Sequence, residues 1–139
     1  MTSRWARCKQ GSTAVEFAIL SPVYFLFLLG MIAYGIYLGA AHSVQQLASE
    51  AARLSVAGLS ETERREMALD YITTHSSGYA FVDPEKLEIL VSDSVADGTR
   101  FVVGLRYDAR HLPIWNLFDG LVMPGTTIER RSTVRIGGV

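Results

Sequence analysis

The stretch Gly11-Ser12-Thr13-Ala14-Val15-Glu16-Phe17 leads directly into 25 residues without a charge, from Phe17 to Ala41. As a helix that rises 1.5 Å per residue, this run spans about 38 Å, whereas the hydrocarbon core of a bilayer is about 30 Å thick. The apolar core of a secretory signal peptide is shorter, at roughly 7–15 residues. The sequence therefore predicts a transmembrane helix over residues 12–41, with the Glu16 carboxylate at its mouth.

The charges around this helix predict its orientation. Three cations, Arg4, Arg7 and Lys9, precede it, and the residues just after it carry one acid and one histidine. By the positive-inside rule the N-terminus lies in the cytoplasm and residues 42–139 lie outside it. Beyond the three leader cations the chain holds 10 basic and 14 acidic residues. Nucleic-acid binding needs a basic face, so a nucleic-acid partner is not expected.

Several residues inside the apolar run are candidates for helix packing or for the membrane interface. Pro22 removes a backbone donor and is expected to kink the helix. Gly35 and Gly39 form a Gly-x-x-x-Gly face, which lets two helices approach closely; two glycines that merely sit in a long helix would give the same pattern. Tyr34 and Tyr37 suit the outer interface, where tyrosine is common.

Apolar residues continue at helical spacing beyond the membrane-length run, in a segment from 42 to 57 that lacks glycine and proline. Steps of three and four residues predict one long helix over about 14–57, half in lipid and half in water. We expect the stripe to pack on the chain's own domain rather than in a coiled coil. It consists of Val44, Leu47, Ala51, Leu54 and Gly58.

A short second helix is predicted from a capping box in which Ser60 is followed three residues later by Glu63. Ser76, Ser77 and Gly78 end this helix. One face of the helix is apolar or aromatic and consists of Met67, Ala68, Tyr71 and Ile72.

The rest of the chain alternates with the period of a strand and predicts three strands that form an antiparallel meander. Asp97-Gly98 supplies a turn between the first two strands. Arg130 and Ser132 interrupt the apolar face of the last strand. The fold class is therefore α+β, with the aqueous half of the long helix covering the sheet. The apolar faces are Leu87, Ile89 and Val91; Phe101, Val103, Leu105 and Tyr107; and Ile128, Val134 and Ile136.

Residues that could carry catalysis or bind a metal do not form a recognisable set. His42, His75 and His111 fall in three separate predicted elements, and the lone cysteine, Cys8, lies in the leader. The segment 93–98 has part of a calcium-loop spacing but lacks the later carboxylate, so it is read as a hairpin turn. We therefore predict no metal, no cofactor and no enzymatic activity.

The connection before the last strand holds an apolar cluster. Two interpretations remain open: a small core of its own, or a contact patch for another subunit. The cluster consists of Trp115, Leu117, Phe118, Leu121 and Val122.

The order of basic leader, Gly-x-x-x-x-Glu-Phe, uncharged helix with an early proline, aqueous helix and small sheet resembles the TadE-like minor pilins (pseudopilins) of the tight-adherence, or Flp (type IVc), pilus system. The resemblance implies a pilin-like fold and cleavage by a prepilin peptidase between Gly11 and Ser12. Glu16 and Phe17 match the acid and the aromatic residue that the family uses in assembly. TadF-like and TadG-like relatives share this pattern.

The same resemblance implies a place and a set of partners. The protein would lie in the bacterial inner membrane as a single-pass protein with a periplasmic domain over residues 42–139, and it would be required for pilus assembly, whether or not it enters the fibre. Its partners would be the prepilin peptidase, other minor and major pilins, the inner-membrane assembly platform and the lipid bilayer.

The Glu16 carboxylate has two interpretations. In the related type IV assemblies it meets the free α-amine of a neighbouring subunit, which here would belong to Ser12 after cleavage. Alternatively, it only reaches the cytoplasmic surface of the membrane.

Two other functional classes are compatible with the sequence. One is a single-pass membrane-anchored periplasmic binding or sensor module, which would keep Met1. The other is a small exported enzyme cut at Gly39-Ala40-Ala41, which would begin near His42.

Overall fold

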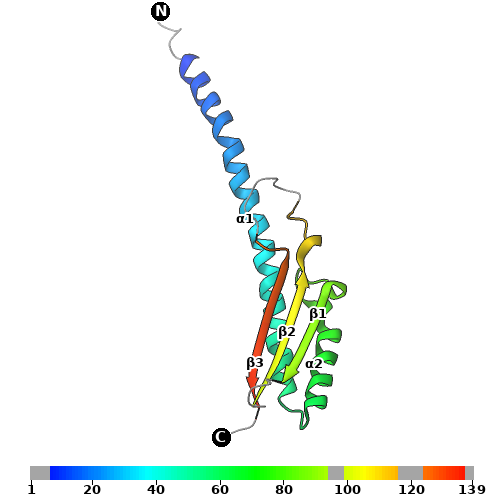
Figure 1. Cartoon of the computed structure of the whole chain (residues 1–139). Helices are drawn as coiled ribbons and strands as arrows, with labels where there is room; N and C mark the ends of the chain where they lie inside the picture. Colours follow the sequence, from blue (N-terminus) through cyan, green and yellow to red (C-terminus); the bar gives the residue numbers. More distant parts are fainter. Residues whose placement is uncertain (1–6, 94–98, 116–123, 137–139) are drawn as a thin grey trace, which may run out of the picture. The chain divides into compact units, whose positions relative to one another are not determined.

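The computed structural model describes residues 7–93, 99–115 and 124–136 (Figure 1). The chain divides into two compact units, Met1–Gly35 and Ile36–Val139. Within the described residues, the first unit is the N-terminal part of helix α1 (Arg7–Ser55). The second unit contains the rest of α1, a second helix and a three-stranded sheet. The predicted α+β fold is therefore confirmed.

Helix α1 is a single helix of 49 residues. Its end at Ser55 lies two residues from the predicted end, but its start at Arg7 lies seven residues before the predicted start, so that boundary was wrong. The residues Arg7, Lys9 and Gln10 are good helix formers, and one glycine inside a helix costs only about 1 kcal/mol. Gly11 therefore does not stop the helix.

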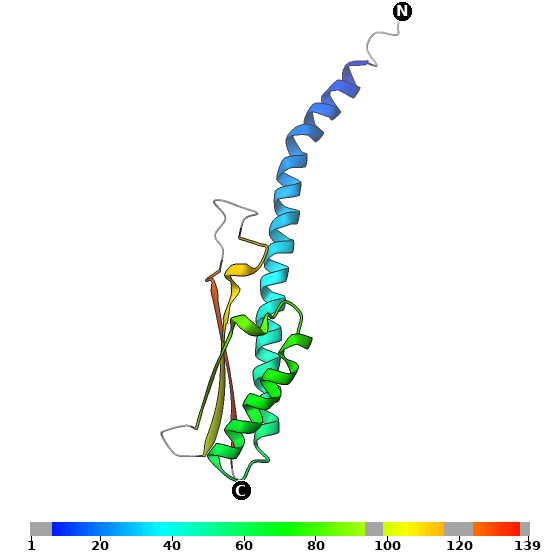
Figure 2. The same cartoon turned by 90° about the vertical axis from the view of Figure 1, so that its right-hand side faces the viewer.

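The sheet is an antiparallel meander with the strand order β1-β2-β3, as predicted. β1 (Leu87–Asp93) pairs with β2 (Arg100–Asp108), which pairs with β3 (Thr127–Arg135). Both helices of the second unit, α2 and the part of α1 from residue 36 onward, lie on one face of the sheet (Figure 2). The opposite face of the sheet bears the polar side chains.

The core lies between this helical layer and the central strand. The four inward-facing residues of β2, which are Phe101, Val103, Leu105 and Tyr107, are completely buried. The two edge strands bury less, since Arg130 and Ser132 share the inner face of β3 with Ile128 and are only half-buried. Arg130 and Ser132 interrupt the apolar pattern of β3 because this strand lies at the margin of the core.

The stripe on α1 packs on the chain's own domain, as expected, but it includes one wrong residue. Val44, Leu47 and Ala51 are completely buried, whereas Leu54 is 50% exposed. Ser55 is buried in its place and its hydroxyl donates to the carbonyl of Ala51. Because consecutive residues are about 100° apart around a helix, Ser55 lies within the buried side of α1 and Leu54 lies just outside it.

The turn between the helices fixes the start of α2 (Glu61–His75). A Cβ atom on Gly58 would lie only 2.8 Å from Cγ and 2.9 Å from the backbone nitrogen of Arg64, so this close approach needs glycine. The Ser60 hydroxyl accepts a bond from the backbone N–H of Glu63 at 3.2 Å. The Glu63 carboxylate in turn accepts from the N–H of Leu59. The predicted capping box is confirmed, with its return bond one residue earlier than usual.

The other predicted features of α2 are also present. Ala68 and Ile72 are buried, and Met67 and Tyr71 are half-buried beside them. The helix ends at His75 and is followed by a 3-10 turn over Ser76–Gly78.

The two leucines of the α1 stripe, Leu47 and Leu54, provide a test of this packing. Leu47→Ala removes a completely buried side chain and is expected to lower the free energy of unfolding by about 2–5 kcal/mol. Leu54→Ala, the matched variant at the half-exposed position, is expected to cost about 1 kcal/mol or less. The measurement is urea unfolding of the full chain in detergent micelles, followed by tyrosine near-ultraviolet circular dichroism. Equal losses of unfolding free energy in the two variants would contradict the burial of Leu47 and the exposure of Leu54 on α1.

Candidate functional site

The N-terminal part of α1 has exposed apolar side chains, which no other described part of the protein covers. Phe17 is 72% exposed and Met31 is 74% exposed, and the large apolar residues between them are also exposed. The segment from Thr13 onward is long and apolar enough to cross a membrane. Such a surface requires either lipid or another apolar helix as its neighbour.

The predicted assembly residues lie at the start of this surface. The side chains of Glu16 and Phe17 are exposed, and Glu16 is the only charged residue between Thr13 and Ala41. A hollow of about 340 Å³ begins at Phe17 and follows one side of the helix. Its lining is aromatic and aliphatic apart from the hydroxyls of Ser21 and Tyr24, and consists of Phe17, Leu20, Ser21, Tyr24 and Phe25.

Three other predicted positions fall within α1. The peptide bond between Gly11 and Ser12 lies in its first turns, since the helix begins at Arg7. Pro22 lies inside the helix and does not end it. The helix axis bends in the blue, N-terminal part of the ribbon (Figure 2), as expected for a helix with an internal proline.

The two glycines of the Gly-x-x-x-Gly pair have different surroundings. A Cβ atom on Gly35 would meet nothing within 4 Å, so its face of the helix is open. A Cβ atom on Gly39 would lie 3.1 Å from the ring of Phe81. The described structure therefore already places an aromatic side chain on the second glycine.

A carboxylate cluster that the sequence analysis missed joins three segments of the second unit. Glu50 on α1 accepts hydrogen bonds from the hydroxyls of Tyr71 on α2 and Tyr79, which follows the 3-10 turn. The side-chain amide of Gln46 donates to the other carboxylate oxygen of Glu50 at 2.9 Å. Tyr71 also stacks on His75, with ring centroids 4.2 Å apart.

These bonds change the acidity of Glu50. The hydroxyl of Tyr71, followed by the Gln46 amide and the Tyr79 hydroxyl, lowers the pKa of Glu50 from 4.5 to about 2. Hydrogen bonds to the charged form favour ionisation. The Glu50 carboxylate therefore stays ionised at neutral pH and accepts the hydrogen bonds that hold the segments together. No local pattern predicts this contact, because the tyrosines lie 21 and 29 residues after Glu50.

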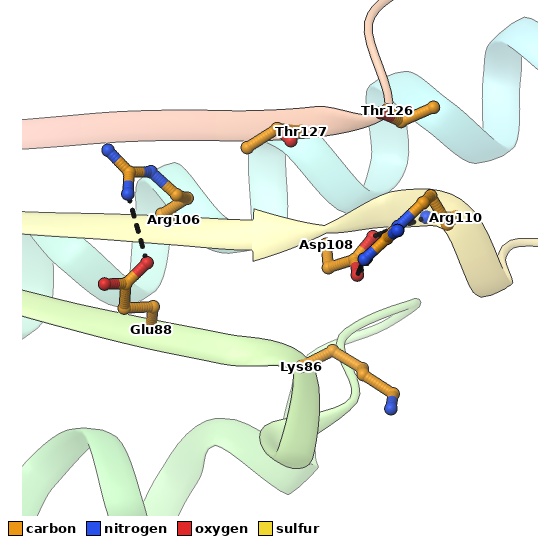
Figure 3. Close-up of a pocket in the computed structure, with 7 residues that line it drawn as sticks. All are labelled: Lys86, Glu88, Arg106, Asp108, Arg110, Thr126 and Thr127. Atoms are coloured by element: carbon orange, nitrogen blue, oxygen red, sulfur yellow. Dashed lines mark hydrogen bonds and ion pairs between the residues drawn. The ribbon is translucent and has the colours of Figure 1, made fainter.

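The outer face of the sheet carries a polar hollow of about 370 Å³ (Figure 3). Arg106 at its centre contacts Glu88 at 3.2 Å and Glu129 at 3.6 Å. At its edge Arg110 contacts Asp108 at 2.6 Å. The hollow is lined by Lys86, Glu88, Arg106, Asp108, Arg110, Thr126 and Thr127.

The charges of this hollow largely satisfy one another. The Arg110 guanidinium holds the pKa of Asp108 far below its usual range, and the Arg131 guanidinium lowers the pKa of Glu129. Paired arginines in alternation with acids form a solvated, balanced surface rather than the basic face that nucleic acids bind.

The three histidines lie on separate elements, as predicted. His42 is on α1, His75 ends α2, and His111 is in a 3-10 turn (Ala109–His111), where it bonds the hydroxyl of Tyr107. Among the residues that the structure describes, no group of three histidine, cysteine, aspartate or glutamate side chains is arranged to hold a metal ion.

Two predictions fall on residues that the structure does not describe. The Asp97-Gly98 turn and most of the apolar cluster, from Leu117 to Val122, lie outside the described ranges. Trp115 is described, and its indole N–H donates to the carbonyl of Ala109 at 2.6 Å.

A long helix whose first half is long and apolar enough to cross a membrane, a short second helix and a three-stranded antiparallel sheet define an α+β protein with the pilin-like order of elements. The sequence model of the TadE-like protein family matches residues 11–53, and this match confirms the resemblance inferred from the sequence. It covers less than half of the chain and includes the Gly11-to-Phe17 segment and the first three residues of the stripe on α1, Val44, Leu47 and Ala51. The matched family is associated with the Tad pilus and is not a known enzyme family. No curated protein and no solved structure matches.

The Glu50 cluster predicts a specific dependence of stability on pH. Because the pKa of Glu50 is lowered, its contribution is fully present above about pH 4.5 and is lost as pH falls towards 2. Glu50→Gln is expected to unfold at a lower temperature at pH 7, and its deficit relative to the unmodified chain should shrink from pH 4.5 to 2. The measurement is thermal unfolding by circular dichroism across this range.

Glu61→Gln is the matched control, since Glu61 is an exposed carboxylate on α2. Its profile is expected to follow that of the unmodified chain. A deficit in Glu50→Gln that is the same at every pH would contradict the role of the ionised group.

Proposed function

We propose that this chain is a minor pilin of the tight-adherence pilus system, matured by a prepilin peptidase between Gly11 and Ser12 and required for pilus assembly. The observation that carries the proposal is the Glu16-Phe17 pair at the head of an uncovered apolar helix, inside the segment that matches the TadE-like family. The partners would be the peptidase, other pilins of the system and the inner-membrane assembly platform.

The exposed side chains of α1 support this role. Before assembly, lipid would cover residues such as Phe17 and Met31; after assembly, helices of neighbouring subunits would cover them. Transfer between two apolar surroundings costs little hydrophobic free energy, so close packing and polar pairing can determine where the helix lies. The aromatic hollow that starts at Phe17 offers a site where side chains of a neighbouring helix can interlock.

Glu16 would supply the polar pairing. A carboxylate near the end of a membrane helix is most stable when it is solvated or paired with a cation. Cleavage after Gly11 would give the next residue, Ser12, a free α-ammonium group. A carboxylate from one subunit and an ammonium from the next then attract each other strongly at low dielectric. This pairing would favour docking of a subunit in register with its neighbour.

The position of the cut within α1 gives glycine a physical role. A peptidase must open the helix locally to reach the bond after Gly11, and glycine has the lowest helix propensity after proline. The small residue therefore eases unwinding and also leaves space for the enzyme to approach.

The second unit would lie in the periplasm under this proposal. The Glu50 cluster and the buried face of β2 hold it as one folded body. Its outer sheet face carries paired charges, which keep the surface soluble and leave few unpaired ions to desolvate in contacts with other subunits.

Processing is tested by Gly11→Val. A branched side chain next to the bond is expected to block cleavage, so the full-length precursor should accumulate in the membrane. The measurement is N-terminal sequencing of protein from membranes, which should find Ser12 in the unmodified chain and Met1 in the variant. Gln10→Val is the matched control and should still yield Ser12. A start near His42 in the unmodified chain would instead indicate an exported soluble protein.

The role of the carboxylate is tested by Glu16→Gln, which removes the charge and keeps the size of the side chain. The variant is expected to be processed and inserted at normal abundance, because it lies beyond the cut, but to lose co-purification with other pilins and to abolish piliation. The measurement is a pull-down and a count of pili in a strain that carries only the variant.

The control is Glu61→Gln, which removes a charge from the exposed surface of α2. It should associate and support piliation normally. Normal piliation by Glu16→Gln would show that the carboxylate only reaches the membrane surface.

A further inference from the structure

One residue of the second unit has an unusual backbone. Phe81 has φ of 61°, and no other non-glycine residue that the structure describes has a positive φ. Its side chain is 51% exposed. The left-handed region is unfavourable for an aromatic residue and is normally occupied by glycine or asparagine. Strain of this kind persists where the surroundings enforce it, and such positions cluster at functional sites.

The surroundings of Phe81 enforce this conformation. The hydroxyl of the buried residue Tyr107 donates to the Phe81 carbonyl at 2.8 Å. The same hydroxyl accepts a bond from the N–H of Asp83 at 3.1 Å and lies 2.8 Å from Nε2 of His111. The backbone that follows the Cα atom of the strained residue is therefore tied to one hydroxyl of a core residue.

The strained residue presents its ring to α1. The ring of Phe81 lies against Gly39, where a Cβ atom would be only 3.1 Å from two ring carbons. Beside it on the helix, Leu38 is exposed and the hydroxyl of Tyr37 donates to the carbonyl of Gly125 at 3.1 Å. The folded domain thus contacts residues 37–39, although these belong to the uncharged run that ends at Ala41.

The contact between the domain and residues 37–39 sets the depth of Phe81 relative to the proposed membrane span. Counted from Phe17, about 30 Å of hydrocarbon takes up about 20 residues of helix and ends near residue 36. The polar headgroup layer adds roughly 5–8 Å on each side, which corresponds to residues 37–41. The Phe81 ring, at the level of Gly39, then falls within the headgroup layer.

A hollow that begins at Leu38 has a lining with the chemistry of this layer. This hollow of about 190 Å³ beside α1 combines two apolar residues, Leu38 and Ala41, with the cation Arg130. Long cationic side chains with apolar stems are typical of membrane interfaces, where the stem packs on acyl chains and the charge meets lipid phosphate. His42 and Gln45 complete the hollow.

We infer that Phe81 is an interfacial membrane anchor, whose ring inserts with Leu38 among the phospholipid headgroups of the outer leaflet and seats the domain on the bilayer. The inference rests on the proposed membrane span. The hydrogen-bonded backbone holds the ring in place, and Gly39, which has no Cβ atom, leaves the space that the ring occupies beside the helix. Lipid, rather than a neighbouring subunit, is the occupant because the site is continuous with the apolar run.

Fluorescent labelling of the full chain tests the inference. Single-cysteine variants are made in a Cys8→Ser background at three exposed positions, Phe81, Leu59 and Ile32. Each is labelled with nitrobenzoxadiazole and reconstituted into vesicles of phosphatidylethanolamine and phosphatidylglycerol. Leu59, which is 93% exposed on the turn between the helices, is the aqueous control. Ile32 lies in the apolar run and is the lipid control.

We expect the label at position 81 to have a blue-shifted emission, quenching by spin-labelled headgroups, and an iodide quenching constant about threefold below that at position 59. A label that is lipid-embedded at 32 but aqueous at 81 overturns this inference and leaves the proposed function intact. A label that is aqueous at both positions overturns the membrane span and this inference together. Protection at 81 that appears only when other pilins are added assigns the site to a subunit and also overturns the inference.

A second variant separates lipid contact from folding. Phe81→Gly adopts the left-handed backbone without strain and removes the ring. We expect an unchanged Tm for the domain and an iodide quenching constant at a label on Leu38→Cys that rises about twofold. Unchanged quenching at that label would overturn the role of the ring as an anchor.

Discussion

A single helix that must satisfy two different surroundings is the constraint on which this structure depends. From Phe17 to Met31 the large apolar side chains of α1 are exposed, so the described part of the protein leaves them to another neighbour. From Ala40 onward one side of the same helix is filled by alanine, valine and leucine and is completely buried on the sheet. Small residues allow close approach there, whereas large ones earlier suit lipid or other helices. The sheet and α2 form one folded unit with the part of α1 from Ala40 onward, because they bury its apolar side chains.

Two polar contacts then fix the unit around the helix. The Glu50 carboxylate joins α1 to Tyr71 and Tyr79, and the Tyr107 hydroxyl joins the central strand to the segment at Phe81. Each uses a tyrosine whose ring packs while its hydroxyl reaches a partner, which suits the boundary between core and surface. The first contact depends on an ionised group with a pKa of about 2, so it persists at neutral pH.

The proposed functions place polar or aromatic chemistry at both ends of the apolar run. Glu16 would act at the cytoplasmic end, where pairing with a neighbour sets the register of assembly, and Phe81 would act at the outer end, where headgroups meet the domain. Between them the helix has no charge and can exchange lipid for protein neighbours. The two sites differ in origin, since Glu16 belongs to the helix itself and Phe81 is brought to Gly39 by folding of the domain.

The sequence by itself determined the fold class, the capping of α2, the strand alternation and the resemblance to the TadE-like family, because these depend on local periodicity and short motifs. Tertiary structure decided the rest. Leu54 continued the apolar spacing, yet the arc that faces the sheet excludes it. The Glu50 cluster and the Phe81 contact join residues that lie from 21 to 42 positions apart, and a strained φ leaves no local signature in the sequence. Such contacts arise only once the sheet brings separate segments to the same side of the helix.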